Sequence, residues 1–302
     1  MTITIAPDSK LILADDAFIT ANNGLTLKGG SSATSRSGET IVLSNGILTN
    51  KADTNPGPGY YKNLIKVYGG ELIIENMTLI NDPDWHYHGD GVERPFNSAA
   101  IMYWNDAKIT ITNSRVISGE FALCGMGRGG VNTAVVNLKD SYFESTSSNI
   151  HNGKNWAYCM RIFGSSATLE NCEVKGIQGG FSAEENDNVV IKGSKTRFYT
   201  VNTEGKQDAF YPVYVSSSAC VTIEDGEFIG ANNWSGGVLT EGTSCLVSGD
   251  NDNNYPSGNI IIKGGKFSGK AYNHVTKTIY QPESWVALDE SEAPLLWTVK
   301  AE

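Results

Sequence analysis

The chain of 302 residues is 40% hydrophobic, and its 33 acidic residues against 23 basic ones give a formal net charge of −10. Nucleic-acid binding rests on clustered Lys and Arg, so this balance argues against a nucleic-acid partner. No apolar segment approaches the length of a spanning helix, which predicts no membrane insertion. Residues 1–10 lack a basic stretch followed by a long apolar run, so we expect either a secretion signal already removed or another exit route, such as inside a phage particle.

Residues 1–58 contain only short strand signals. These lie at Thr2–Ile5, Lys10–Ile12, Leu25–Leu27 and Ile41–Leu43. We interpret the region as an N-terminal cap with irregular first coils, because the first edge of a stacked sheet needs protection from other chains.

Residues 59–270 repeat one short pattern seven times. Two apolar residues alternate, a turn residue follows two positions later, and a third apolar residue follows three positions after the turn. Of the 21 apolar positions in this pattern, 20 are filled by apolar residues and the exception is Thr196. The turn residues are Asn76, Asn113, Asp140, Asn171, Gly193, Asp225 and Gly264.

The pattern predicts stacked parallel strands. Alternation with period two indicates a strand with one buried face. Asn, Asp and Gly tolerate the left-handed backbone that a sharp corner requires. One such unit cannot bury its own face, but copies stacked about 4.8 Å apart form a continuous core. An earlier strand in each coil gives about three strands per coil, at Leu64–Tyr68, Ala100–Trp104, Tyr158–Phe163 and Pro212–Ser216.

This organisation resembles the right-handed parallel β-helix of the pectin-lyase-like superfamily, over about residues 60–270. The resemblance implies an all-β solenoid, which we divide into an N-terminal cap (1–58), a parallel β-helix (59–270) and a small C-terminal β cap (271–302). The ending, with Gly264-Gly265-Lys266-Phe267-Ser268 followed by Tyr280, resembles that of repetitive surface proteins of gut bacteria.

The insertion between Ile80 and Ala99 is the richest in chemical groups. His86, His88 and Asp90 alternate, so in an extended segment they share a face and are suited to ligating a metal or to acid–base work. Trp85 adds an aromatic surface beside them. The alternative is a polar surface loop held by its prolines and by packing of Trp85.

A second candidate lies on the earlier strand of each coil. If Ile65, Val67, Met102, Trp104, Met160 and Ile162 point inward, then Lys66, Tyr103 and Arg161 form an outward row along the helix axis, with Arg128 nearby. Aromatic faces and guanidinium groups suit an anionic sugar chain. The alternative is a solenoid surface that mixes charges and aromatics for solubility.

Residues 250–254 begin like a calcium loop, with oxygen-bearing side chains at Asp250, Asp252 and Asn254. Tyr255 replaces the glycine of the sharp turn, and Ile261 stands where the closing glutamate belongs, so an EF-type site is rejected. An irregular calcium site stays open beside the interpretation as a solvated turn.

Polysaccharide lyases of the resembled superfamily use an Arg or Lys base with calcium-held carboxylates. The resemblance therefore makes Arg161 the candidate base, with Arg128 nearby and Glu184, one coil later, as a calcium ligand. The hydrolase motifs of the superfamily are not reproduced, because Ala134 follows Asn132-Thr133 and Phe163 follows Arg161-Ile162.

Five cysteines, an odd number at scattered positions, favour buried free thiols, although one bridge stays open. We expect a non-catalytic β-helix module of a bacterial cell surface or phage virion, without a cofactor unless calcium binds. It is expected to bind a polysaccharide or cell-surface glycan, or to act as a rigid adhesive spacer, as a monomer or a trimer. The alternative is a polysaccharide lyase acting on an acidic polysaccharide.

Overall fold

The computed structural model describes residues 2–4, 10–13, 18–20, 26–28, 33–50, 62–81, 98–126, 133–146, 158–176, 179–200, 212–216, 218–229, 244–248, 258–267, 270–273, 278–280, 286–287 and 297–299. All regular structure in these residues is β-strand, as the sequence predicts. No helix long and apolar enough to cross a membrane occurs among them.

Sheet A consists of two ladders of parallel strands that share β6 (Thr40–Asn50) and β8 (Glu71–Asn81). The first ladder continues through β10 (Lys108–Thr112), β13 (Ala134–Lys139), β16 (Ser165–Glu170), β19 (Asn188–Lys192), β22 (Cys220–Ile223) and β25 (Asn259–Ile262), with β1 (Thr2–Thr4) before β6. The second continues through β11 (Arg115–Ser118), β14 (Tyr142–Ser145), β17 (Glu173–Gly176), β20 (Arg197–Thr200), β23 (Glu227–Ile229) and β26 (Gly265–Phe267), with β2 (Lys10–Leu13) before β6.

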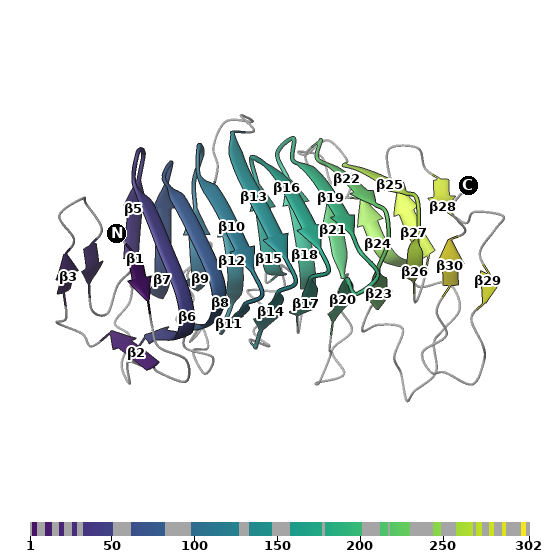
Figure 1. Cartoon of the computed structure of the whole chain (residues 1–302). Helices are drawn as coiled ribbons and strands as arrows, with labels where there is room; N and C mark the ends of the chain where they lie inside the picture. The colour runs from purple at the N-terminus through teal and green to yellow at the C-terminus, as the bar shows by residue number, and fades with distance from the viewer. Residues whose placement is uncertain are drawn as a thin grey trace, which may run out of the picture.

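Sheet B is a third parallel ladder. Its strands are β5 (Ala33–Arg36), β7 (Lys62–Tyr68), β9 (Ser98–Tyr103), β12 (Phe121–Gly125), β15 (Tyr158–Phe163), β18 (Gly179–Glu184), β21 (Val213–Val215), β24 (Ser244–Ser248) and β27 (Lys270–Asn273). From β10 onward a parallel strand pairs with the strand three further along the chain, so the chain returns to each ladder once per coil (Figure 1). The architecture is consistent with a β-helix-like solenoid.

Antiparallel strands occur only near the two ends of the described chain. At the N-terminal end β3 (Phe18–Thr20) pairs with β4 (Thr26–Lys28), which pairs with β5. At the C-terminal end β28 (Thr278–Tyr280) pairs with β27, and β30 (Trp297–Val299) pairs with both β26 and β29 (Val286–Ala287). These strands lie where the sequence predicts caps, whereas the exact domain boundaries stay a prediction.

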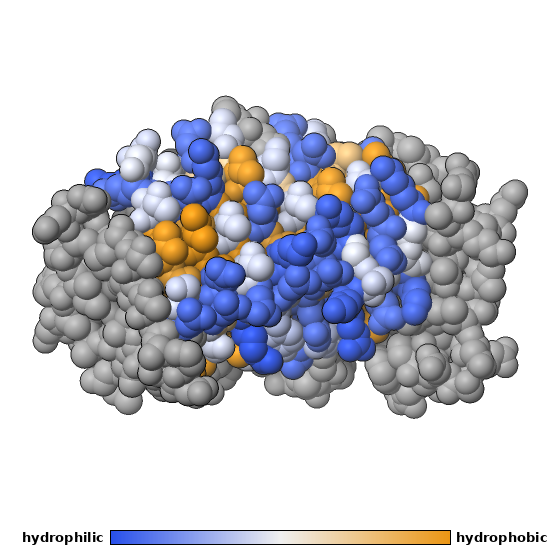
Figure 2. Space-filling model, viewed as in Figure 1, coloured by the Kyte–Doolittle hydropathy of each residue, from blue (hydrophilic) through white to orange (hydrophobic). Residues whose placement is uncertain are grey.

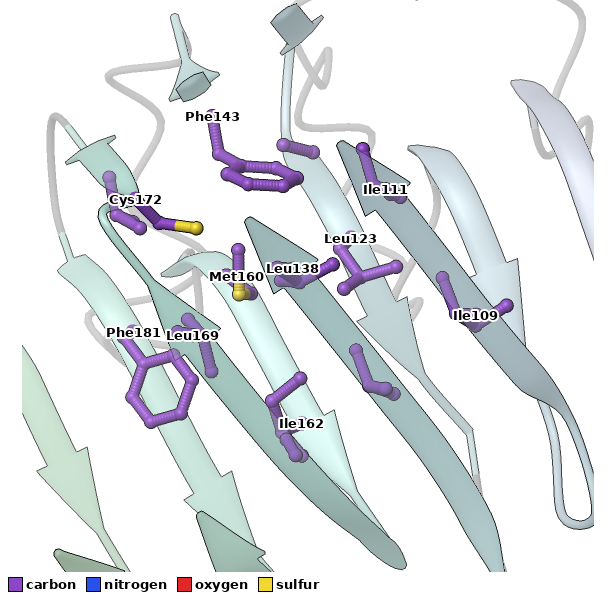
Figure 3. Close-up of a cluster of buried hydrophobic side chains, with 14 of the residues drawn as sticks. Ile109, Ile111, Leu123, Leu138, Phe143, Met160, Ile162, Leu169, Cys172 and Phe181 are labelled. Atoms are coloured by element: carbon purple, nitrogen blue, oxygen red, sulfur yellow. The ribbon is translucent and has the colours of Figure 1, made fainter. Parts of the chain in front are cut away.

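The core lies between the two sheets and is one continuous apolar column (Figure 3). Leu72, Ile109, Val136, Ala167 and Val189 are register partners in successive coils, as the repeat predicts. The pattern also occurs once upstream of the seven predicted copies, at Ile41, Leu43, Asn45 and Leu48, and β6 pairs there with β8.

The predicted corners are confirmed for Asn76, Asn113, Asp140, Asn171 and Gly193, which all have positive φ. The prediction is wrong by one residue at Asp225 and Gly264, where Gly226 and Gly265 have φ of 125° and 109°. These angles lie beyond the left-handed region that Asn or Asp tolerates, so only glycine serves there.

The serine residues that directly follow two of the corners form hydrogen bonds between neighbouring coils. The Ser114 hydroxyl accepts a hydrogen bond from the Met77 backbone N–H at 3.0 Å, and the Ser141 hydroxyl accepts one from the Ser114 N–H at 3.1 Å. Each hydroxyl also donates to the carbonyl two residues earlier, at 2.8 and 2.7 Å. Neighbouring coils are therefore linked at the corner by buried hydrogen bonds.

Thr196 was the one polar residue in the predicted apolar positions, and a longer corner explains it. Phe198, two residues later, pairs with Val174 of the preceding coil and Phe228 of the next. Phe198 and Phe228 have ring centroids 5.4 Å apart, and Phe228 stacks on Phe267 at 5.1 Å. The Thr196 hydroxyl is satisfied by the Lys192 carbonyl at 2.6 Å.

The outer face of sheet A is polar, with paired charges. Lys139 and Lys192 both reach Glu170, at 2.8 and 3.2 Å, across adjacent strands of the first ladder. On the second ladder Lys175 pairs with Glu144 at 2.7 Å. Figure 2 shows a largely hydrophilic surface with small apolar areas. Val135 and Ile261 are the exposed large hydrophobic side chains of sheet A among the described residues.

Four cysteines are free thiols, in keeping with the sequence interpretation: Cys124, Cys159, Cys172 and Cys220. Cys172 is fully buried at its corner, whereas Cys220 is half-buried. The side chain of Cys245 lies outside the described residues.

Candidate functional site: the outer face of sheet B

The outer face of sheet B differs from that of sheet A because some of its strands bury their outward side chains as well as their inward ones. All residues of β12 and β18 are buried, on both faces of the sheet. A second hydrophobic cluster, separate from the main core, contains Ala99, Met102, Phe121, Cys124 and Tyr158, with Trp104, Met126 and Tyr214 packed against it.

Aromatic side chains gather on this face. Tyr68 and Trp104 stack with ring centroids 4.1 Å apart, and Tyr158 and Tyr214 stack at 5.8 Å. Tyr68 is 41% exposed, the largest value among the large hydrophobic side chains of the described residues. Phe121 and Phe163 bring the aromatic side chains on this face to six among the described residues, whereas the outward strand positions of the first ladder contain none.

Strand register places one row of side chains along this face. Its members, in coil order, are Lys66, Met102, Cys124, Arg161, Ser182 and Tyr214. The next outward row includes Tyr68, Trp104, Phe163 and Glu184, which lie two residues further along their strands or just after them. The face therefore combines two cations, one carboxylate and several aromatic rings.

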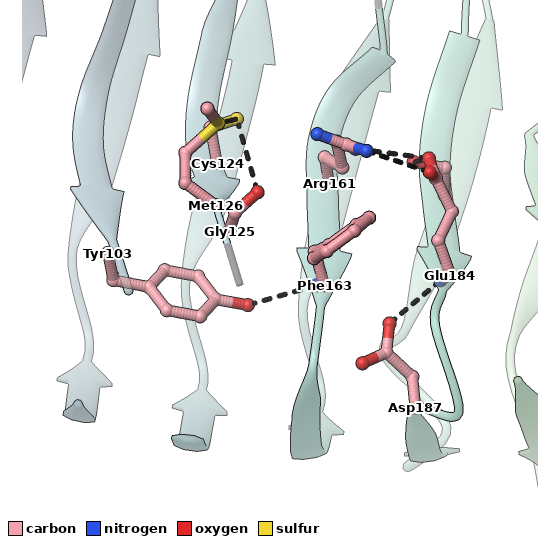
Figure 4. A network of polar contacts seen from close by, with 9 residues as sticks. Tyr103, Cys124, Gly125, Met126, Arg161, Phe163, Glu184 and Asp187 are labelled. Atoms are coloured by element: carbon pink, nitrogen blue, oxygen red, sulfur yellow. Dashed lines mark hydrogen bonds and ion pairs between the residues drawn. The ribbon is translucent and has the colours of Figure 1, made fainter. Parts of the chain in front are cut away.

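Arg161 and Glu184 form a two-pronged ion pair at the centre of the face (Figure 4). Arg161 Nε donates to Glu184 Oε1 at 3.1 Å and Nη2 donates to Oε2 at 2.8 Å, while the side chains are 8% and 10% exposed. The guanidinium lies 4.3 Å from the Phe163 ring centroid, and the Ser182 hydroxyl also donates to Glu184 Oε1 at 3.2 Å. Burial acts to lower the pKa of Arg161, but the Glu184 carboxylate outweighs it and raises that pKa.

Asp187 anchors the corner that follows Glu184. Its Oδ2 accepts a hydrogen bond from the Glu184 N–H at 2.8 Å, and its Oδ1 accepts one from the Ser165 N–H at 2.6 Å. The Asp187 side chain is 1% exposed, and burial raises its pKa well above the usual value despite these two donors. Its position, between the end of β18 and the start of β16, makes it a link between adjacent coils.

Tyr103 extends this network from the inside of the solenoid. Its hydroxyl lies 2.9 Å from the Ser165 hydroxyl and accepts a longer hydrogen bond of 3.4 Å from the Phe163 N–H. Burial, and then the charge of Asp187, raise the pKa of Tyr103, so the phenol stays neutral. Tyr103 thus supports the strand that carries Arg161 without reaching the surface.

Cys124 lies beside Arg161 in the same row and is fully buried. Burial raises the pKa of the thiol to about 12, although the Arg161 charge acts in the opposite direction. Only a thiolate is a strong nucleophile, so the structure assigns Cys124 to packing rather than to covalent chemistry.

The predicted outward row is partly wrong. Lys66 and Arg161 do point outward and share one row, but Tyr103 is fully buried in the main core. Met102 and Trp104 were both predicted to point inward, but Met102 belongs to the outer cluster as the register partner of Lys66, and Trp104 packs against that cluster. Two consecutive residues, Ala100 and Ile101, both face the core, so the inward and outward positions exchange within the strand.

The other predicted site residues lie outside the described residues. These are Trp85, His86, His88 and Asp90, Arg128, and the weak calcium candidates Asp250, Asp252 and Asn254. Within the described ranges no group of three or more His, Cys, Asp or Glu side chains is placed to hold a metal ion. Tyr68, Trp104 and Phe163 were not identified as site residues from the sequence. One signal was available for the first two: Tyr68 and Trp104 are 36 residues apart, which equals the separation of the register partners Asn63 and Ala99 on the same strands.

Chemically, the face is suited to binding and poorly suited to proton abstraction. A base at Arg161 must lose a proton from a group whose pKa is raised by a bidentate carboxylate partner. Both oxygens of Glu184 accept hydrogen bonds from the guanidinium, and Oε1 also accepts one from the Ser182 hydroxyl, so this carboxylate is committed to the ion pair in the structure. Comparison of the chain with protein-family models, with curated proteins and with solved structures gave no match.

Proposed function

We propose that the chain is a non-catalytic, right-handed parallel β-helix of the pectin-lyase-like type that binds a glycan on the outer face of sheet B. The proposed setting is a bacterial cell surface or, as the alternative, a phage virion, where a stiff solenoid also separates its two ends as a spacer. The all-parallel ladders and the return of the chain once per coil support the β-helix assignment.

One observation carries the binding function: the outer face of sheet B carries six aromatic side chains together with the Arg161–Glu184 pair. Aromatic rings present apolar faces and edges that pack against the C–H groups of sugars, and a rigid polar group beside them fixes orientation. The first ladder, built on the same coils, has outward Thr, Val, Asn and paired charges instead. The difference between faces of one scaffold favours a specific role for sheet B.

The alternative function, lysis of an acidic polysaccharide with Arg161 as base, receives less support. The ion pair holds Arg161 protonated and occupies Glu184, which are the two groups that this mechanism needs. A cofactor is not part of the proposed binding function, and calcium stays a prediction.

A glycan array followed by calorimetric titration tests the proposal. We expect the wild-type chain to bind at least one glycan class, and Tyr68→Ser and Trp104→Ala to weaken that binding by roughly tenfold or more. The matched control is Tyr142→Ser, on the outer face of the second ladder, which is expected to bind as the wild type does. Circular dichroism establishes that each variant is folded.

The same glycans are then incubated with the protein, with and without calcium, while the absorbance of unsaturated products is followed. Turnover that disappears in Arg161→Ala would establish the lyase alternative and contradict the non-catalytic assignment. Binding that is equally lost in Tyr142→Ser would place the site on another face. Absence of binding to any glycan would leave the spacer role.

A further inference from the structure

Among the described cations that are not exposed, Lys66 alone lacks an ion pair with a carboxylate. It lies half-buried on the outer face of sheet B, and among the described residues its ammonium group has no hydrogen bond or ion pair. Burial lowers its pKa, with no carboxylate to counter the effect in the described part of the chain. Seven other described cations each lie within 4.0 Å of a carboxylate oxygen: Lys139, Arg161, Lys175, Lys192, Arg197, Lys263 and Lys266.

An unpaired, half-buried ammonium is unfavourable in a chain where carboxylates are plentiful. Removing a charge from water costs free energy unless an opposite charge or hydrogen bonds replace the lost solvation. The sequence has 33 acidic residues against 23 basic ones, so a partner for Lys66 was available in composition. Its register partners instead are Thr34 and Met102, neither of which carries a charge.

The surroundings of Lys66 are those of a ligand contact. Tyr68 is two residues further along β7 and stacks on Trp104, which gives the most exposed aromatic surface of the face. Arg36 is the register partner of Tyr68 on β5. Burial raises the Tyr68 pKa, and the positive charge of Arg36 acts against this increase. Two cations therefore flank the aromatic pair at the N-terminal end of the face.

The central cation is already neutralised. The Arg161 guanidinium makes two hydrogen bonds to Glu184, so its charge is already compensated. An anionic group of a ligand would therefore be attracted more strongly to the Lys66 ammonium, which has no ion pair among the described residues. A charge-assisted hydrogen bond to Lys66 is stronger than a neutral one, and the partial burial of the ammonium reduces screening by salt.

We propose that Lys66 is the anion-recognition residue of this face, and that its ligand is a glycan bearing an anionic substituent, which binds beside the Tyr68–Trp104 stack. Carboxylates of uronic acids and sulfate esters share the required chemistry. The inference rests on the proposed function, and it assigns the recognition of charge to Lys66 and not to Arg161.

Matched pairs of oligosaccharides test it by calorimetry. The first pair is an oligogalacturonate and its carboxyl-reduced form, and the second is a chondroitin sulfate oligosaccharide and its desulfated form. We expect the wild-type chain to prefer one anionic member over its partner by roughly tenfold, with affinity falling as salt is raised. The pair that shows the preference identifies the anionic group.

Lys66→Gln is expected to remove that preference while keeping the affinity for the neutral form, and Lys66→Arg to retain much of the preference. Lys139→Gln, which removes an exposed cation from sheet A, is the matched control and is expected to behave as the wild type does. Thermal melting establishes that the variants are folded.

The outcomes separate this inference from the proposed function. Binding that depends on Trp104 but shows no preference for an anionic glycan, or a preference that survives Lys66→Gln, would overturn the role of Lys66 and leave the glycan-binding function standing. Failure to bind any glycan would overturn both.

Discussion

Sheet A and sheet B are built from the same coils, yet the ion pairs on their outer faces differ in exposure to solvent. On sheet A, Lys139 and Glu170 pair with side chains 52% and 30% exposed, and Lys175 and Glu144 with 30% and 16%. On sheet B the Arg161 and Glu184 side chains are 8% and 10% exposed and make two hydrogen bonds to each other. Charges in solvent keep a stacked sheet soluble and discourage association, whereas a buried pair requires the surrounding structure to be fixed.

The contrast indicates how one repeat supports two roles. The outward positions of sheet A can vary without disturbing the core, because water solvates whatever charge they carry. Those of sheet B are tied to the interior through Asp187, Ser165 and Tyr103. A substitution on the outer face of sheet B is therefore expected to lower the stability of the stacked coils.

The largest expected effect follows from breaking the buried pair. Arg161→Ala leaves the Glu184 carboxylate buried without its partner, so we expect the free energy of unfolding to fall by about 3–5 kcal/mol. Urea unfolding measures the change. A double variant, Arg161→Met with Glu184→Leu, removes both charges and is expected to recover most of the loss, whereas a loss below about 1 kcal/mol in the single variant would contradict the comparison.

A smaller effect is expected from removing the Tyr103 hydroxyl. Tyr103→Phe leaves the ring packed in the core but takes an acceptor from the Phe163 N–H and a partner from Ser165. Loss of a buried hydrogen-bond partner costs about 1–3 kcal/mol, measured again by urea unfolding. Tyr142→Phe is the matched control, because its hydroxyl donates to Glu144 on the half-exposed second ladder, and an equal loss there would count against a special role for sheet B.

The contribution of Asp187, which links the coils beneath sheet B, to the stability of the protein is expected to depend on pH. Its folded-state pKa is raised, so between the unfolded value of about 3.9 and the folded value the folded protein binds more protons than the unfolded one. The contribution of Asp187 to stability is therefore complete below about pH 3.9 and is lost as the pH rises through the folded pKa.

Unfolding of the wild type and of Asp187→Asn at a series of pH values measures this contribution. We expect the stability of the wild type relative to the variant to decrease as the pH rises. A relative increase would mean that the two backbone donors outweigh burial and that the pKa is depressed instead.

The smallest effect is expected on sheet A. Lys175→Ala removes a salt bridge whose charges stay in contact with water, so the free energy of unfolding should change by about 0–1 kcal/mol. The difference should shrink further at high salt, since screening weakens exposed pairs most. A loss comparable to that of Arg161→Ala would remove the distinction between the two faces.

The candidate site was partly predictable. Lys66 and Arg161 were identified from their positions in the predicted strands and Glu184 from the resemblance to polysaccharide lyases, and all three lie on one face. Their grouping as a base and a calcium ligand did not anticipate that the two opposite charges meet directly. Tyr103 and Trp104 were both assigned to the wrong face, because strict alternation fails where Ala100 and Ile101 both point inward.

The sequence by itself determined the parts that obey local rules. Period-two alternation identified the core columns, and the tolerance of Asn, Asp and Gly for positive φ identified most corners, because both depend on residues close in the chain. Only the tertiary structure decided which face each sheet B residue occupies, that Phe198 replaces Thr196 in the core column, and that Arg161 is neutralised by Glu184 from the next coil. These outcomes depend on register between strands more than 20 residues apart, and a single extra residue in a strand or corner shifts that register without leaving a local signal.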